Sequence, residues 1–112
     1  MYPKVQDKDI EEAWILLLNQ KLDLIEAKCI SHGGITGTAI DIRIILKEAL
    51  LRNATAIALC HNHPSGNPRP SREDDNITNS LKKAADTMHI YFVDHVIVAQ
   101  QHFYSYREEG RI

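Results

Sequence analysis

The stretch HNHPSGNPRPSRED, residues 61–74, decides how this chain folds, because it marks the passage from a strand to a helix. Before it, residues 54–60 form a short apolar run bounded by loop signals, which is typical of a buried strand. Three prolines and a glycine inside the stretch indicate a stiff loop with a tight bend. Ser71 and Asp74 are spaced almost as in a capping box, so we expect a helix over residues 71–89.

Hydrophobic periodicity on both sides of this stretch predicts the remaining elements. Residues 13–32 alternate about a turn near Asn19, which favours a β-hairpin. Residues 42–52 carry apolar side chains at helical spacing, and Asp41 is a suitable N-cap. We also expect a short strand or extended turn at 38–41, and strands at 93–99 and 103–106. The predicted core faces are Ile42, Ile45, Leu46, Ala49 and Leu50 in the first helix, and Ile77, Leu81, Ala84, Ala85 and Met88 in the second.

This order of elements, close to βββαβαββ, predicts an α/β fold in which helices flank a central sheet. At 112 residues the chain has room for one domain and one core. No apolar run approaches the roughly 18 residues that span a bilayer, and the N-terminus shows no signal pattern, so we expect a cytoplasmic protein without a membrane partner. A net charge of −2 provides no basic field for nucleic acid, and two cysteines provide no disulfide framework.

The histidines of this stretch are candidate metal ligands. His61 and His63 are two residues apart, so in a strand their side chains point to the same face, while Asn62 points elsewhere. Imidazole nitrogens and carboxylate oxygens are ligands of zinc, and a catalytic zinc site keeps three protein ligands. Asp74 is placed to supply the third. An isolated H-x-H pair more often marks polar residues at a strand end, so the wider spacing decides between the two interpretations.

The full spacing matches a known signature. Two histidines, seven residues, Ser71, two residues and Asp74 form the JAMM signature of the MPN-domain metallopeptidases. The longer string at 61–74, with the later pair Asp94 and His95, resembles the RadC family in particular, and the resemblance spans roughly residues 16–112. It implies a cytidine-deaminase-like α/β/α sandwich with a mixed central sheet.

The resemblance also implies a function. His61, His63 and Asp74 are expected to hold Zn²⁺, with Ser71 nearby to stabilise an oxyanion and a glutamate to act as general base. The implied activity is that of a zinc metallopeptidase acting on a peptide or isopeptide bond, and the family name implies a link to DNA repair. The expected partner is a peptide or protein substrate, and a homo-oligomer is compatible with the sequence. Direct contact with nucleic acid has no support in the charge or motifs.

The same resemblance predicts a single RadC-like JAMM domain over residues 1–112. Residues 1–12 are expected to be a leading segment, and the family's N-terminal helix-hairpin-helix is expected to be absent from this chain.

The catalytic base is the point at which the chain departs from the pattern. The family glutamate lies on an early strand ahead of a Gly-Thr or Gly-Ser step, and the matching position here is Lys28. Glu26 points the same way in a strand, so a small register shift or bulge could bring it to the metal site. The interpretation of Glu26 as a solvated strand residue is slightly favoured over this one. Glu48 is a more distant candidate. The alternative function is a metal-binding or interaction module that has lost the base.

Several other residues have two interpretations. The Ser71 hydroxyl can cap the helix as well as assist catalysis. Asp94 and His95 favour a structural role in a strand, with a hydrogen bond to a metal-binding histidine as the alternative. Cys60 is expected to be a core residue on the face opposite His61. An HNH-type nuclease is disfavoured, because that name describes dispersed residues and because the chain is acidic overall.

Overall fold

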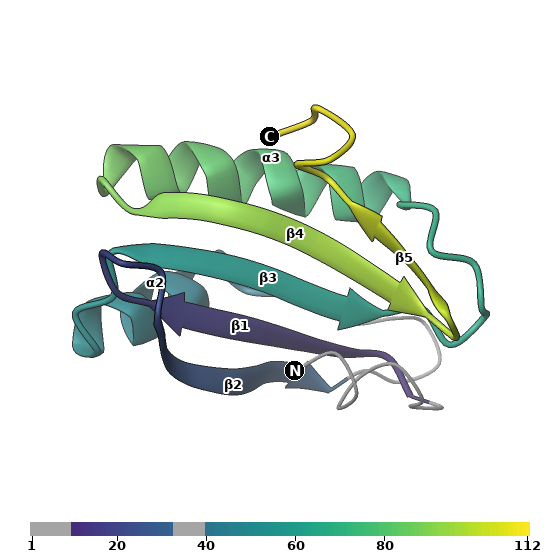
Figure 1. Ribbon diagram of the computed structural model, residues 1–112, viewed down its shortest axis with the longest axis horizontal. Helices are drawn as coiled ribbons and strands as arrows, with labels where there is room; N and C mark the ends of the chain where they lie inside the picture. The colour runs from purple at the N-terminus through teal and green to yellow at the C-terminus, as the bar shows by residue number, and fades with distance from the viewer. Residues whose placement is uncertain (1–9, 33–39) are drawn as a thin grey trace.

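The structure is a computed structural model, and it describes residues 10–32 and 40–112 (Figure 1). The expected short strand at 38–41 falls mostly outside these residues, and its described part leads directly into a helix. The described elements, in chain order, are β1 (Glu12–Leu18), β2 (Leu24–His32), α2 (Ile42–Leu51), β3 (Ala56–Asn62), α3 (Arg72–Thr87), β4 (Tyr91–Ala99) and β5 (His102–Ser105).

The described strands form one mixed sheet in the order β2-β1-β3-β4-β5. β3 and β4 are parallel and are connected through α3, while the other neighbours are antiparallel. The predicted hairpin of β1 and β2 is confirmed, and the Asn19 side chain closes its turn by accepting hydrogen bonds from the backbone N–H groups of Lys21 and Asp23, both at 2.9 Å. The end of β3 and the first turn of α3 therefore lie at the same end of the sheet (Figure 1).

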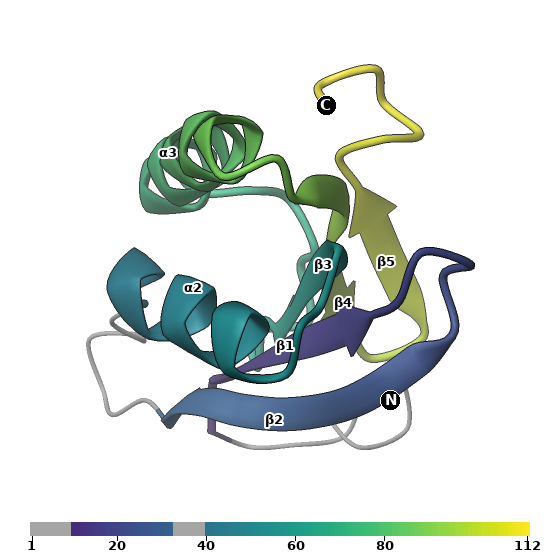
Figure 2. The ribbon, with the colours of Figure 1, turned by 90° about the vertical axis from the view of Figure 1, so that its left-hand side faces the viewer.

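Both described helices pack on one face of the sheet, as Figure 2 shows. The mixed sheet flanked by helices is the predicted fold class. An α/β/α sandwich needs a helix on each face, however, and no helix within residues 10–32 and 40–112 covers the second face. The main core between the helices and the sheet includes Ala13, Ile15, Leu17, Ile45, Ala49, Ile57, Leu59, Leu81 and Ala85.

The buried faces of the helices agree with the expected ones in part. Asp41 caps α2 as predicted, accepting a 2.9 Å hydrogen bond from the backbone N–H two residues on. Within α2, Glu48 is buried and Leu50 is exposed. Within α3, Thr78 is buried, and Met88, the C-cap of that helix, is exposed. Buried polar side chains need polar partners. Both Glu48 and Thr78 have them. Periodicity predicts Ile45, Ala49, Leu81 and Ala85 correctly, but it cannot identify these two buried polar residues.

β3 extends through Asn62, two residues beyond the predicted end, so His61 belongs to the strand itself. Cys60 is buried on the opposite face, as predicted, where it packs with Val98 and Trp14. Burial raises the pKa of the Cys60 thiol to about 11, so the group stays protonated and is a poor metal ligand. Across residues 10–32 and 40–112, no helix is long and apolar enough to cross a membrane.

Candidate metal centre

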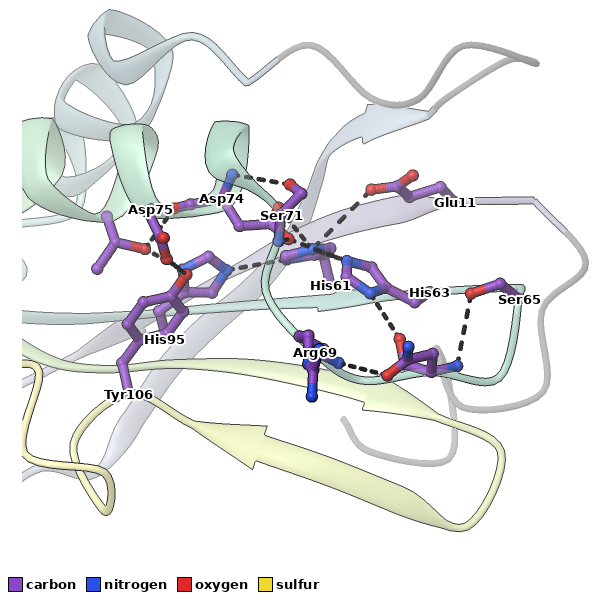
Figure 3. Close-up of polar contacts among 12 residues, drawn as sticks. Glu11, His61, His63, Ser65, Arg69, Ser71, Asp74, Asp75, His95 and Tyr106 are labelled. Atoms are coloured by element: carbon purple, nitrogen blue, oxygen red, sulfur yellow. Dashed lines mark hydrogen bonds and ion pairs between the residues drawn. The ribbon is translucent and has the colours of Figure 1, made fainter.

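Two histidine side chains from the end of β3 lie next to each other (Figure 3). The Nε2 atoms of His61 and His63 are 3.1 Å apart. The backbone N–H of His63 continues the sheet by donating to the Val98 carbonyl at 2.8 Å. The Nδ1 of His63 lies 2.9 Å from the carbonyl oxygen of Asn67. Because a carbonyl can only accept, that Nδ1 carries a proton, and a neutral His63 ring keeps its lone pair at Nε2.

Asp74 brings a carboxylate from the first turn of α3 to both rings. Its Oδ1 is 3.1 Å from Nε2 of His61, and its Oδ2 is 3.1 Å from Nε2 of His63. Oδ2 also accepts from the backbone N–H of Ser71 at 2.8 Å, while Ser71 Oγ accepts from the Asp74 backbone N–H at 3.0 Å, which completes a capping box. Burial opposes the ionisation of Asp74, but hydrogen bonds from the two imidazoles in their protonated form outweigh it and hold the Asp74 pKa well below its ordinary value.

The donor atoms of these three side chains have the spacing that a zinc ion requires. Tetrahedral ligands at ~2.0–2.1 Å from zinc lie roughly 3.3 Å from one another. The three contacts among His61, His63 and Asp74 are each 3.1 Å. Two imidazoles and a carboxylate are also a common ligand set of catalytic zinc. The residues present therefore fit this ion in both chemistry and spacing.

A second carboxylate, that of Glu11, lies beside the histidines. Its Oε1 is 3.9 Å from Nε2 of His61, and the ligand atoms of Glu11, His61 and His63 lie within 4.8 Å of one another, a group that could hold a metal ion. Ala13 pairs with His61 across β1 and β3, and strand alternation places Glu11 on the same face as Ala13. Sequence analysis missed Glu11 because it assigned residues 1–12 to a leading segment. The alternation that buries Ala13 was the signal that could have found it.

Asn62, which stands between the two histidines, holds the backbone on both sides of Glu11. Its Oδ1 accepts from the backbone N–H of Glu12 at 2.6 Å, and its Nδ2 donates to the carbonyl of Ile10 at 3.1 Å. The Asn62 side chain is buried, so these bonds are shielded from water. The tripeptide at 61–63 thus supplies both histidines and the contact that positions the neighbouring carboxylate.

The structure does not bring Glu26 to this cluster, which corrects the expectation from sequence. Glu26 pairs with Leu17 of β1, whereas the position of β1 that pairs with His61 is Ala13, nearer the other end of the strand. No bulge in the hairpin overcomes this separation. Instead, Oε1 of Glu26 accepts a 3.0 Å hydrogen bond from Nε of Arg52, and this bond lowers the Glu26 pKa.

Lys28 and Glu48 also have a different role from the one considered. Nζ of Lys28 and Nη1 of Arg52 each lie 3.5 Å from Oε1 of Glu48. The contact of Lys28 joins β2 to α2, whereas that of Arg52 lies within α2 and its C-cap. Glu48 is therefore an ion-pair residue between sheet and helix, and the lysine at the expected position of the base does not face the histidines.

The pair Asp94 and His95 divides between two roles. Asp94 connects β4 to the chain beyond β5, because its Oδ1 accepts from the backbone N–H groups of His95 and Arg107 and its Oδ2 accepts from the Ser105 hydroxyl. His95 faces the histidine cluster, with its Nε2 2.9 Å from Nδ1 of His61 (Figure 3). His95 is fully buried, and burial holds its pKa well below the ordinary value of histidine.

A cavity of about 290 Å³ reaches the cluster at Asp74 and Glu11. Its remaining walls come from the first turns of α3 and from the residue just before the α2 cap. They combine apolar and polar side chains, so an extended ligand can contact both kinds. These lining residues are Ile40, Glu73, Asn76, Ile77 and Ser80.

Known proteins resemble this chain along nearly its whole length. The family model described as RadC-like JAB domain matches residues 1–111. A UPF0758 protein of Flavobacterium johnsoniae is 39% identical over 110 residues, which are 98% of this chain and 48% of that protein. A UPF0758 protein of Symbiobacterium thermophilum is 41% identical over 108 residues, 96% of this chain and 46% of that protein. The chain spans about half the length of the curated relatives it matches.

Proposed function

The chain belongs to the RadC-like JAB domain family, and on that basis we propose that it is a zinc-dependent hydrolase that cleaves a peptide or isopeptide bond. The observation that carries this proposal is the convergence of two imidazoles and two carboxylates. His61, His63 and Asp74 contact one another at 3.1 Å, and the Glu11 carboxylate lies 3.9 Å from His61. Three of these groups suffice to hold zinc, and the fourth is left for proton transfer.

We assign His61, His63 and Asp74 as the zinc ligands, because Asp74 contacts both rings directly while Glu11 is farther away. Zinc bound there would supply a Lewis acid that polarises a carbonyl oxygen and lowers the pKa of a water molecule. Ser71 holds Asp74 in place through the capping box, so the start of α3 and the third ligand are positioned together.

Glu11 is the general base in this proposal. Its side chain is 23% exposed and lines the cavity, so it can reach both water and substrate. The carboxylate accepts the proton of the attacking water and then passes it to the leaving amine. A proton transfer of this kind typically contributes about 10²- to 10⁴-fold in rate.

Ser71 has a second role in the proposal. Its hydroxyl oxygen accepts a hydrogen bond from the Asp74 backbone, and a hydroxyl that accepts one hydrogen bond can still donate its own proton. The side chain is exposed at the start of α3, next to the proposed ligands. We assign this proton to the oxyanion that develops on the scissile carbonyl.

A metal-binding module without catalysis was the alternative suggested by Lys28 at the expected position of the base. Lys28 contacts Glu48 instead, and Glu11 supplies a carboxylate beside the histidines. The reason for considering the inactive module as an alternative therefore no longer applies.

The test measures zinc content and turnover in the same proteins. Wild type, Glu11→Gln and Glu26→Gln are compared for bound zinc and for cleavage of proteome-derived peptides and of lysine-branched isopeptides. We expect zinc in all three proteins, equal cleavage by wild type and Glu26→Gln, and cleavage about 10²- to 10⁴-fold slower in Glu11→Gln. Glu26→Gln is the matched control, because it removes a carboxylate from the same sheet at a distance from the histidines.

Two outcomes would count against the proposal. Cleavage by Glu11→Gln at the rate of wild type would remove Glu11 from the mechanism. A wild-type protein that takes up no zinc would remove the metal site itself, and with it the hydrolase.

A further inference from the structure

We propose that Thr78 and His95 form a directed hydrogen-bond chain that fixes the ring orientation and the tautomer of His61. Both are positioning residues for the metal ion and touch neither metal nor substrate. The inference rests on the proposed zinc site and adds to it one residue from α3 and one from β4.

This hydrogen-bond chain passes through the buried interior behind His61. Nδ1 of His61 is 2.9 Å from Nε2 of His95, and Nδ1 of His95 is 2.5 Å from Oγ1 of Thr78. Oγ1 of Thr78 is in turn 2.7 Å from the backbone carbonyl oxygen of Asp74. His61, His95 and Thr78 are each at most 1% exposed, so water does not compete for these bonds.

The direction of every hydrogen bond follows from the last acceptor. A carbonyl oxygen can only accept, so the single hydroxyl proton of Thr78 is donated to the backbone carbonyl oxygen of Asp74. Oγ1 of Thr78 must then accept from His95, which places the proton of the buried, neutral ring on Nδ1 and leaves a lone pair on Nε2. That lone pair accepts from Nδ1–H of His61. The Nε2 of His61, on the side of His63 and Asp74, is thereby left with the lone pair that a metal needs.

The plane of the His95 ring is also held. The ring of Tyr106 stacks on it, with centroids 4.9 Å apart and planes 8° apart. The Tyr106 hydroxyl donates to Oδ1 of Asp75 at 2.7 Å, and Arg111 lies over the Tyr106 ring at 4.9 Å from its centroid. These contacts prevent His95 from rotating away from His61. The hydrogen-bond chain therefore has a fixed geometry as well as a fixed direction of donation.

The two proposed histidine ligands are therefore oriented by different hydrogen-bond partners. His63 is oriented directly by the backbone carbonyl of Asn67. His61 is oriented through His95 and Thr78, and the chain ends on the backbone of Asp74, the residue whose side chain is the third proposed ligand. The helix that delivers the carboxylate thus also sets the protonation of one histidine.

Thr78→Val and Thr78→Ser form a matched pair for the test. Valine keeps the shape of threonine and removes the hydroxyl, whereas serine keeps the hydroxyl. Zinc affinity is measured by competition with a chelating dye, and the fold of each metal-free variant is checked by circular dichroism. Loss of a partner behind a metal-binding histidine typically weakens metal binding by 10- to 100-fold. We expect about 10-fold weaker binding for Thr78→Val and affinity close to that of wild type for Thr78→Ser.

A second readout needs no variant. Nitrogen-15 spectra of the histidine rings in zinc-loaded wild type are expected to show neutral His95 with its proton on Nδ1. A proton on Nε2 of His95, or unchanged zinc affinity in Thr78→Val, would overturn the inference while leaving the zinc site intact. Wild type that binds no zinc would overturn the site and the inference together.

Discussion

The two described helices contact each other and lie on the same face of the sheet, yet they bury different kinds of side chain. Each contributes one buried carboxylate, Glu48 from α2 and Asp74 from α3. In α2 the rest of the buried face is apolar, whereas in α3 the polar residues occupy the first half and the apolar residues the second. The buried residues are Ile45, Glu48 and Ala49 in α2, and Asp74, Thr78, Leu81 and Ala85 in α3.

The partners of the two carboxylates explain the difference. Oε1 of Glu48 lies 3.5 Å from the cations of Lys28 and Arg52, and that oxygen makes no hydrogen bond. The Asp74 carboxylate lies 3.1 Å from the imidazoles of His61 and His63, which can be neutral, and it accepts a 2.8 Å hydrogen bond from the backbone N–H of Ser71. Lysine and arginine side chains are positively charged and do not bind metal ions, whereas the nitrogen of a neutral imidazole can bind a metal through its lone pair. α2 therefore serves the stability of the fold, and the first half of α3 serves the site.

The largest effect is expected from removal of each buried carboxylate in turn. Asp74→Ala should weaken zinc binding by more than about 100-fold, because loss of a ligand should exceed the 10- to 100-fold effect of losing a partner behind it. Glu48→Ala should leave zinc affinity unchanged, since its partners are Lys28 and Arg52. Chelator competition measures both. Weaker zinc binding in Glu48→Ala would erase the distinction between the helices.

Next in size is the effect of a cavity in the core beneath α2. Ile45 is completely buried, and Ile45→Ala should lower the free energy of unfolding by about 2–5 kcal/mol. Denaturant titration of the metal-free protein measures this loss. Under conditions in which the variant remains folded, its zinc affinity should match that of wild type. A proportional loss of zinc affinity would show that α2 also shapes the site.

The fold was largely predictable because its signals are local. The hairpin, both helix starts and the apolar strand β3 follow from periodicity and capping residues. The buried faces of the helices were less predictable, because Glu48 and Thr78 are buried through partners that are distant in sequence, Lys28 and His95. Periodicity carries no information about such partners.

The candidate site divides in the same way. His61, His63 and Asp74 lie within one stretch of sequence, and the structure brings their side chains together. Glu11 comes from another strand, and its position depends on the register between β1 and β3. The register between strands that are distant in sequence cannot be predicted from one sequence. A shift of two residues keeps the same side chains on the same face, so several pairings fit the same alternation. Glu26 was considered as the base because it lies two residues from Lys28 in sequence. The pairing of β1 and β2 places it away from the histidines, opposite Leu17.

A smaller effect is expected at the N-caps of the helices. Ser71→Ala should lower the free energy of unfolding by about 1 kcal/mol, because the backbone N–H of Asp74 loses its acceptor. The same variant should also slow any peptide cleavage, since it removes the proposed oxyanion donor. Asp41→Ala is the matched control at α2. It should lower stability in the same direction and leave cleavage unchanged, and a loss of cleavage in Asp41→Ala would contradict the division of roles.

The smallest effect is expected at a solvent-exposed ion pair of α3. Two ion pairs are spaced i,i+4. One joins Glu48 of α2 to the C-cap residue Arg52, and the other joins Lys82 to Asp86 in α3; the acidic residue comes first only in the α2 pair. An acidic residue followed by a basic one is the more favourable order, because it matches the helix dipole. The Lys82–Asp86 pair is also exposed to solvent, so Lys82→Ala should lower the free energy of unfolding by only ~0.3 kcal/mol, less at high salt. Denaturant titrations at low and high salt measure this, and a loss above about 1 kcal/mol would show that the outer face of α3 contributes to stability more than an exposed ion pair can.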